Sequence, residues 1–185
     1  RRHPADVMRG EEVQVLGAVA LGACPPDALL CQPGTHNKWV EVAGGRITAF
    51  STAMTGELFA LLRDHSILAD MLAAPPEAGP AFAAGLERAG EDLLTSLFGI
   101  RAGVLLGEIA PADAASMASG LLIGADVAAR DVSGRTIHVL AGPALARPYA
   151  AAISAHGGRP VVIDSQPAFL AGMHQIRSLA DAAAR

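Results

Sequence analysis

A turn-rich segment between two apolar stretches brings several polar groups close together. It reads QPGTHNKW from Gln32 to Trp39 and combines hydroxyl, imidazole and ammonium groups around Gly34. Such a loop can direct backbone N–H groups and side-chain donors at a phosphate. An ordinary hairpin turn explains the same residues, because glycine and proline recur in many turns. The chain contains neither GxxxxGKS nor GxGxxG, so the pattern does not support a P-loop or Rossmann site.

Two adjacent carboxylates stand where a helix is predicted to begin. Glu11 and Glu12 follow Arg9 and Gly10. A carboxylate that accepts a hydroxyl proton would meet the modest chemical demand of phosphoryl transfer, which depends mainly on positioning and charge neutralisation. Helix capping explains the same pattern, because acidic residues are favoured in any first helical turn. Both interpretations remain open at this point.

A third candidate is the turn that follows an apolar strand, with Gly142, Pro143 and Ala144 before a helix. Ligands of open α/β sheets lie at the carboxyl ends of strands, and a glycine backbone lets a flat base come close. A plain strand-to-helix turn is the alternative.

Polar residues also surround a predicted helix that begins near Thr55. We expect Thr55 to be its N-cap and His65 to be a favourable cation at its C-terminal end, which accounts for most of this pattern without a function.

The six histidines have no HExxH or other ligand spacing, so we expect no metal held by the protein. They are His3, His36, His65, His138, His156 and His174. The absence of GxSxG argues against the most obvious hydrolase site.

The composition excludes some classes of partner. With 185 residues and 51% hydrophobic residues, the chain can bury one sizeable core, and we expect one domain. Charged residues make up 17% and the net charge is -4, so no large basic surface is available for nucleic acid or an anionic membrane.

The two cysteines, Cys24 and Cys31, are interpreted as buried thiols in a reducing compartment. An alternative is a lipid-anchored binding protein, because an apolar run from Val13 to Ala23 precedes Cys24 and basic residues precede the run. The acidic pair Glu11 and Glu12 directly before the run argues against that signal.

The order of the predicted elements suggests a fold. Residues 6–22 are predicted to be helical, with either Asp6 or Gly10 near the start of the helix. Three strands at 28–31, 38–42 and 46–52 should form an antiparallel meander. Residues 54–57 should lead into a helix through 58–62, which 64–68 ends, and helical periodicity recurs over 82–97 and 110–120. The segment 121–127 is an undecided strand or helix end. Strands are expected at 136–140 and 160–163, and helices at 149–156 and from 167 onward. This is the order of an RNase H-like lobe, although fold-level analogy alone does not establish function.

Five strings, taken in order, resemble successive blocks of the 2-dehydro-3-deoxygalactonokinase family. They are DVMRGEEVQVLGA, LLCQPGTHNKWVEV, ITAFSTAMTGELFALLRDHSIL, GLLIGADV and VLAGPALARPYAAAI. The resemblance covers nearly the whole chain, and the strings PGTHNKW and FSTAMTGELFALLRDHSIL together are its most specific part.

The resemblance implies an actin-like α/β lobe in which a mixed sheet, with its three-stranded meander, is flanked by helices. It implies transfer of the ATP γ-phosphate to the 6-hydroxyl of 2-dehydro-3-deoxy-D-galactonate, with Mg2+, in cytoplasmic galactonate degradation. Residues 1–185 would be the C-terminal nucleotide-binding lobe, and the N-terminal lobe that such kinases also use would be missing, so the chain alone should be inactive. A homodimer is left open.

Mapped through the resemblance, Gly34, Thr35, His36 and Lys38 fall on a phosphate-contacting hairpin. The residues Gly142, Pro143 and Ala144 fall on the adenosine turn. Glu11 is the leading candidate for the catalytic base, although related sugar kinases carry Asp there. Glu12 and Asp6 remain alternatives. The competing function is a non-catalytic member of the actin-like superfamily that binds nucleotide or sugar acid.

Overall fold

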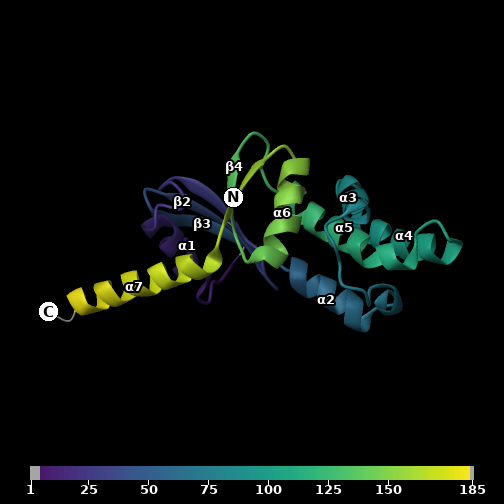
Figure 1. Cartoon of the computed structure of the whole chain (residues 1–185), viewed down its shortest axis with the longest axis horizontal. Helices are drawn as coiled ribbons and strands as arrows, with labels where there is room; N and C mark the ends of the chain where they lie inside the picture. The colour runs from purple at the N-terminus through teal and green to yellow at the C-terminus, as the bar shows by residue number, and fades with distance from the viewer. Residues whose placement is uncertain (1–4, 184–185) are drawn as a thin grey trace. The chain divides into compact units, whose positions relative to one another are not determined.

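The computed structural model describes residues 5–183 and divides them between two compact units (Figure 1). The first unit contains the chain up to Ala53, the segment Thr136–Ala146 and the chain from Pro160 onward. The second unit contains Met54–Arg135 and Arg147–Arg159. Residues 1–4, which include His3, lie outside the described residues. The single lobe over residues 1–185 stays a prediction.

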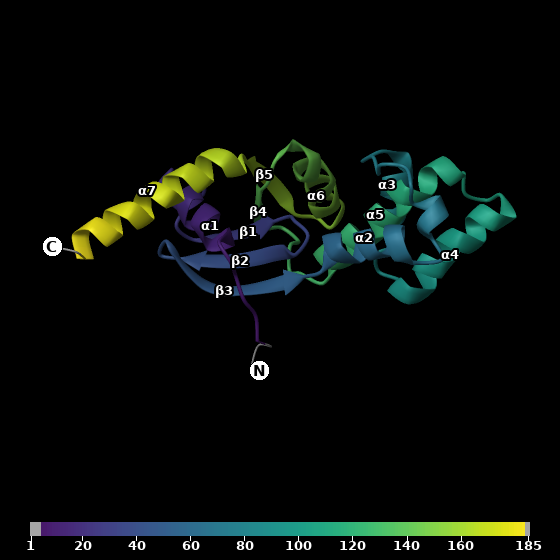
Figure 2. The same ribbon diagram turned by 90° about the horizontal axis from the view of Figure 1, so that it is seen from below.

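The first unit is built on a five-stranded sheet with the strand order β3-β2-β1-β4-β5 (Figure 2). Strands β1 (Ala28–Gln32), β2 (Asn37–Ala43) and β3 (Arg46–Ala53) form the predicted antiparallel meander. Strand β4 (Thr136–Leu140) pairs in parallel with β1, and β5 (Arg159–Ile163) lies beside β4. The predicted α/β class, with a mixed sheet and flanking helices, is confirmed.

Two helices of this unit, α1 (Glu11–Ala20) and α7 (Ser165–Ala183), pack against each other. Their backbones touch at two glycines, since a Cβ atom built on Gly17 would lie 1.8 Å from the carbonyl oxygen of Ala168 and one on Gly172 would lie 2.0 Å from that of Val13. No larger residue fits at such a crossing. The helices and the sheet enclose a core of Val15, Ala18, Cys24, Leu30, Val40, Val42, Leu140, Ile163 and Ala168.

Helix α1 begins at Glu11, so of the two starts expected for the helix over residues 6–22, Asp6 and Gly10, the one at Gly10 is confirmed. Gly10 precedes it with a φ of 109°, in the left-handed region that glycine adopts readily. This turn leaves residues 5–9 outside the helix. The apolar run that resembled a targeting signal mostly forms this core helix, and Cys24 and Cys31 are both buried free thiols. Burial raises the pKa of Cys24.

The second unit is helical and is organised around α5 (Ala114–Ala128). Helices α2 (Thr55–His65), α3 (Pro80–Glu87) and α4 (Leu93–Leu106) all contact α5. The short 3-10 helices η1 (Ala69–Met71) and η2 (Pro111–Asp113) and most of α6 (Pro143–Ala155) complete the unit. Among the described residues, no helix combines the length and apolar character needed to cross a bilayer.

Two predictions for the helices need correction, and one open choice is resolved. The periodic segment 82–97 is not one helix, because Asp92 starts a new helix by accepting a hydrogen bond from the Thr95 backbone N–H at 2.7 Å. The undecided segment Leu121–Val127 is helical. Nearly all of its side chains are buried, so no polar face reveals the helical period. The helix predicted over 149–156 already begins at Pro143, a residue type favoured in a first helical turn.

Candidate functional site

The two glycine bends predicted to bind nucleotide follow the carboxyl ends of β1 and β4, at one end of the strands of the sheet. We call this end of the strands the edge of the sheet. Strands β1 and β4 are parallel neighbours, with Cys31 opposite Val139, so the segments 33–36 and 141–142 leave the sheet at the same end. Parallel strands bring their following loops together in this way. In the first bend Gly34 is half-buried, whereas Thr35 and His36 are exposed. In the second bend Gly142, Pro143 and Ala144 are exposed.

Apart from the two chain neighbours of Gly142, no described part of the chain lies against this residue. A Cβ atom built on this residue would meet nothing within 4 Å. Packing within the chain therefore does not require glycine at this position.

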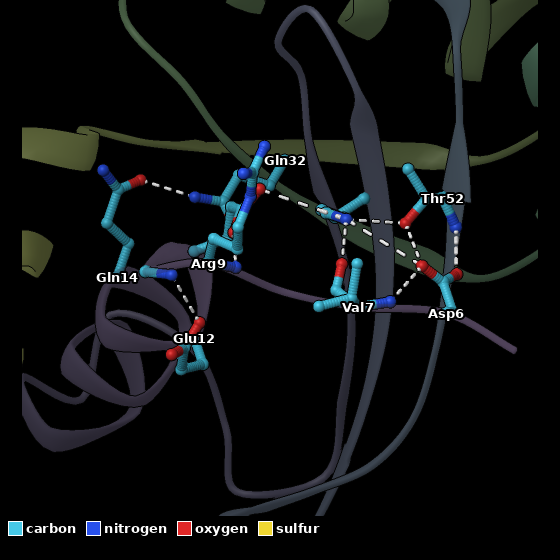
Figure 3. Close-up of polar contacts among 10 residues, drawn as sticks. Asp6, Val7, Arg9, Glu12, Gln14, Gln32 and Thr52 are labelled. Carbon is cyan, nitrogen blue, oxygen red and sulfur yellow. Dashed lines mark hydrogen bonds and ion pairs between the residues drawn. The ribbon is translucent and has the colours of Figure 1, made fainter.

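Lys38 lies at the same edge but is buried. Its register partners are Gln32 at the end of β1 and Thr52 near the end of β3, and only 5% of its side chain is exposed. The Nζ atom donates hydrogen bonds to the Val7 carbonyl oxygen and to Thr52 Oγ1, both at 2.6 Å (Figure 3). The ammonium group thus points to the segment that precedes α1.

Asp6 belongs to this segment and is held by Thr52. Its carboxylate accepts hydrogen bonds from the Thr52 backbone N–H at 2.7 Å, the Thr52 hydroxyl at 2.6 Å and the Val7 backbone N–H at 2.7 Å. Burial acts to raise the pKa of Asp6. These hydrogen bonds, and then the charge of Lys38 at 4.0 Å, outweigh burial and hold the pKa below its usual value.

Glu11 is the second carboxylate near Lys38, with Oε1 at 4.0 Å from Nζ and 31% of its side chain exposed. Its Oε2 accepts a hydrogen bond from the Arg9 backbone N–H at 2.5 Å. Burial acts to raise the pKa of Glu11. The backbone N–H groups of Arg9 and Glu11, and then the charges of Lys38 and Arg9, lower the pKa below its usual value. Glu11 is therefore ionised at neutral pH.

Glu12 lies in a different environment from Glu11. Its Oε2 accepts a hydrogen bond from the Gly10 backbone N–H at 2.9 Å, which is the capping role expected of an acidic residue at a helix start. No ion pair joins Glu12 to Lys38 within the part of the chain that the structure describes. Of the three candidate carboxylates, Asp6 and Glu11 both lie 4.0 Å from the buried ammonium, and Glu12 caps the helix. Asp6 is in addition bound to Thr52, whereas Glu11 is not.

Two amides that the sequence did not single out also belong to this edge. Gln32 Nε2 donates to Gln14 Oε1 at 2.6 Å, which links β1 to the first turns of α1. The other amide atom of Gln32, Oε1, is buried without a hydrogen-bond partner. Thr52 was missed as well. An alternating strand signal marks β3, but it does not say which β3 residue lies opposite Lys38.

The described residues contain no group of three or more His, Cys, Asp or Glu side chains that could hold a metal ion. The buried His138 lies in β4, and burial lowers its pKa. Its Nδ1 atom has no hydrogen-bond partner.

A second buried charged cluster lies wholly in the second unit. Thr55 was predicted to be an N-cap, but Met54 occupies that position and makes no side-chain capping bond. The Thr55 hydroxyl instead donates to Asp126 Oδ2 at 2.9 Å, and Arg130 Nη2 lies 3.5 Å from Asp126 Oδ1. His65 does lie in the last turn of α2, as predicted. The cluster joins the start of α2 to α5.

Comparisons with known proteins agree with one another. A family model described as 2-keto-3-deoxy-galactonokinase matches residues 1–176. A 2-dehydro-3-deoxygalactonokinase from Escherichia coli (strain K12) is 41% identical over 184 residues, which cover 97% of this chain and 61% of the relative. A Rhizobium meliloti (strain 1021) protein carrying the same enzyme name is 41% identical over 186 residues, which cover 94% of this chain and 59% of the relative.

A crystal structure of a protein from Sinorhizobium meliloti, which also carries this enzyme name, matches with a TM-score of 0.86 and 38% identity. The match covers 95% of this chain and 60% of that chain. The chain thus spans about three fifths of the length of the curated relatives it matches.

Proposed function

The chain belongs to the 2-keto-3-deoxy-galactonokinase family, and from that premise we propose that it supplies the nucleotide-binding part of an ATP-dependent sugar-acid kinase. The acceptor is the 6-hydroxyl of 2-dehydro-3-deoxy-D-galactonate, and the enzyme acts in cytoplasmic galactonate degradation. The observation that carries the proposal is the meeting of two glycine bends and the Glu11 carboxylate at one edge of the sheet.

The proposed lobe is of the RNase H-like type found in actin-like kinases. The supporting observation is the strand order, in which an antiparallel meander is extended on its β1 side by β4 and then β5. In the proposed complex, backbone N–H groups near Gly34, together with Thr35 and His36, bind the phosphates. The turn at Gly142, Pro143 and Ala144 lies against the adenosine.

Glu11 is the proposed base. The sugar hydroxyl oxygen attacks the γ-phosphorus, the bond from that phosphorus to the oxygen of the departing ADP breaks, and the hydroxyl proton passes to the Glu11 carboxylate. A base must be unprotonated before the reaction, and the lowered pKa of Glu11 meets that condition at neutral pH. Its partial exposure leaves an oxygen accessible to a substrate hydroxyl.

Mg2+ fits the donor chemistry of this edge. It prefers oxygen ligands and usually enters bound to nucleotide phosphates, with only one or two carboxylates from the protein. The partly exposed carboxylate of Asp6 is an oxygen donor of that kind. When bound with ATP, the ion would neutralise charge on the transferred phosphoryl group.

The proposed enzyme also uses an N-terminal lobe that supplies much of the sugar-acid pocket. The support is the length of the relatives, of which this chain matches 61% and 59%. The 185-residue chain by itself is then expected to be inactive.

A coupled ADP-release assay on the complete gene product tests the proposal. ATP, Mg2+ and the sugar acid together should give ADP release that depends on the sugar acid. Equal ATPase rates with and without the sugar acid would contradict a kinase and favour a nucleotide-binding protein without phosphoryl transfer.

The adenosine turn has its own test. A Gly142→Ala variant should keep the unfolding temperature of the parent, because the added methyl group meets no protein atom. It should weaken ATP binding by about 10-fold, on the order of 1.4 kcal/mol, if the purine lies against this backbone. Unchanged ATP affinity, measured by calorimetry, would remove Gly142 from the nucleotide site.

A further inference from the structure

Lys38 makes contacts that a phosphate ligand would not need. An ammonium group has three donors and no acceptor. Two of these donors already reach the Val7 carbonyl oxygen and the Thr52 hydroxyl at 2.6 Å, and the side chain is 5% exposed. One donor remains, but the carboxylates of Asp6 and Glu11 both lie 4.0 Å from Nζ, so a phosphate bound to Lys38 would be placed beside two negative charges.

The contacts of Lys38 continue through Thr52 to Asp6. The Thr52 hydroxyl accepts from Lys38 and donates to Asp6 Oδ1, while the Thr52 backbone N–H donates to Asp6 Oδ2 (Figure 3). Strands β2 and β3 therefore hold residues 6 and 7 against the end of the meander. We call the contacts among Asp6, Val7, Lys38 and Thr52 the clamp.

The clamp lies close in sequence to the proposed base. Only residues 8–10 separate Val7 from Glu11, and Gly10 turns the chain there into α1. A fixed segment at one end and the core packing of α1 at the other leave Glu11 little freedom to move. The Gln14–Gln32 hydrogen bond further ties α1 to β1.

From these contacts we infer that Lys38 is a positioning residue, which through the clamp holds the segment carrying Glu11 at the edge of the sheet, and that it is not a ligand of the nucleotide phosphates. The inference deepens the proposed function and rests on it for the role of Glu11. The clamp itself does not depend on any activity.

Lys38 acts on Glu11 in two ways. Its hydrogen bonds hold the preceding segment, and its positive charge acts directly on the Glu11 carboxylate. The charged groups that act on the Glu11 carboxylate are Lys38 from β2 and Arg9 from the preceding segment, and Glu12 follows it in the sequence on α1. The side chains contributed by β1 and β3 are the uncharged Gln32 and Thr52. Lys38 and Arg9 lower the pKa of Glu11, so removing either positive charge should raise it.

Chemical labelling distinguishes the two roles of Lys38 without an activity assay. Lys38 is the only lysine among these 185 residues, so its peptide is identified directly by mass spectrometry. We expect acetylation of Lys38 to be at least 10-fold slower than that of an exposed lysine, with or without ATP. A lysine that reacts quickly in the absence of ATP and is protected when ATP binds would overturn the inference.

Threonine variants test the clamp with matched controls. Thr52→Val removes the hydroxyl that joins Lys38 to Asp6, and Thr52→Ser keeps it. Thr48→Val removes a hydroxyl from the same strand that donates to the Glu41 carbonyl oxygen at 3.2 Å, outside the clamp. Amide hydrogen exchange of Val7 and Arg9 should rise about 10-fold in Thr52→Val and stay unchanged in the other two variants. Equal exchange in all three variants would show that there is no clamp.

The kinetic test uses the complete gene product. Thr52→Val should lower kcat about 10-fold and leave KM for ATP within about 2-fold, and Thr52→Ser should restore kcat. Lys38→Met should move the acid limb of the kcat/KM profile to higher pH, because the pKa of Glu11 rises. A large rise in KM for ATP with an unmoved acid limb would assign Lys38 to the phosphates instead. If the parent shows no turnover while labelling and exchange behave as expected, the proposed function fails and the clamp stands.

Discussion

The two buried charged clusters of this chain differ in how they are closed. In the first unit, the ammonium of Lys38 faces two carboxylates at 4.0 Å, and the side chains of Asp6 and Glu11 are 20% and 31% exposed. In the second unit, the carboxylate of Asp126 is 3% exposed, accepts a bond from Thr55 and faces the guanidinium of Arg130. The first cluster leaves carboxylate oxygen open to solvent, whereas the second encloses its carboxylate.

This difference separates a reactive arrangement from a structural one. A buried charge that keeps its partners fixes how two elements pack, and removing one partner lowers the free energy of unfolding. A partly exposed carboxylate beside a buried cation can also meet a substrate. Burial of a charged residue alone would not have distinguished the clusters, since both contain one.

The largest expected effect tests the partly exposed carboxylate of Glu11 in the first cluster. In the complete gene product, Glu11→Gln should lower kcat by about 10²- to 10⁴-fold, the usual contribution of general acid–base catalysis, because a neutral amide cannot accept the proton. The free energy of unfolding should change little. Glu12→Gln is the matched control, since Glu12 bonds to the Gly10 N–H and should matter far less for kcat. Near-normal kcat in Glu11→Gln would remove Glu11 from the role of base.

The next effect tests the closed cluster. Asp126→Ala leaves Arg130 without this carboxylate and the Thr55 hydroxyl without its acceptor, so urea unfolding should show a loss of about 2–3 kcal/mol. Asp131→Ala breaks a pair with Arg135 in which the Asp131 side chain is 87% exposed, and should cost less than about 0.5 kcal/mol. Similar losses in both variants would mean that the Asp126 cluster contributes no more than a surface pair.

A smaller effect separates the two threonines. Thr55→Val keeps the shape of the side chain but removes the donor to Asp126, and we expect it to cost about 1 kcal/mol in thermal unfolding. The variant should keep the kcat of its parent below the unfolding temperature. A loss of kcat comparable to that expected for Thr52→Val would break the distinction between the clusters.

The smallest effect concerns acid stability in the first cluster. The pKa of Asp6 is lower in the folded chain than in the unfolded chain, where it is about 3.9, so the unfolded state binds the proton more readily. Its stabilising contribution is therefore complete above that value and is lost as pH falls through the folded pKa. Urea unfolding should show a shallower loss of stability below about pH 4 in Asp6→Asn than in the parent. Parallel curves would mean that Asp6 is not held as the structure indicates.

The sequence by itself determined most of the sheet and the family. The meander follows from alternating apolar residues around Gly44 and Gly45, and β4 was predicted with its observed bounds, Thr136–Leu140. These signals are local, because side chains alternate between the faces of a strand and glycine permits the turn. The strings around Gly34 and Thr55 also carried the family resemblance that the comparisons confirmed. Local patterns suffice where neighbouring residues set the conformation.

Only the tertiary structure decided what surrounds Lys38. Val42 pairs with Ile47, and continuing that register would place Ser51 opposite Lys38. An irregularity between Glu41 and Val42 shifts the pairing by one residue and places Thr52 there. Asp6 then reaches Thr52 across 46 positions of sequence. Local residue patterns do not encode that meeting, because it depends on the register of β2 with β3 and on the path of the chain before α1.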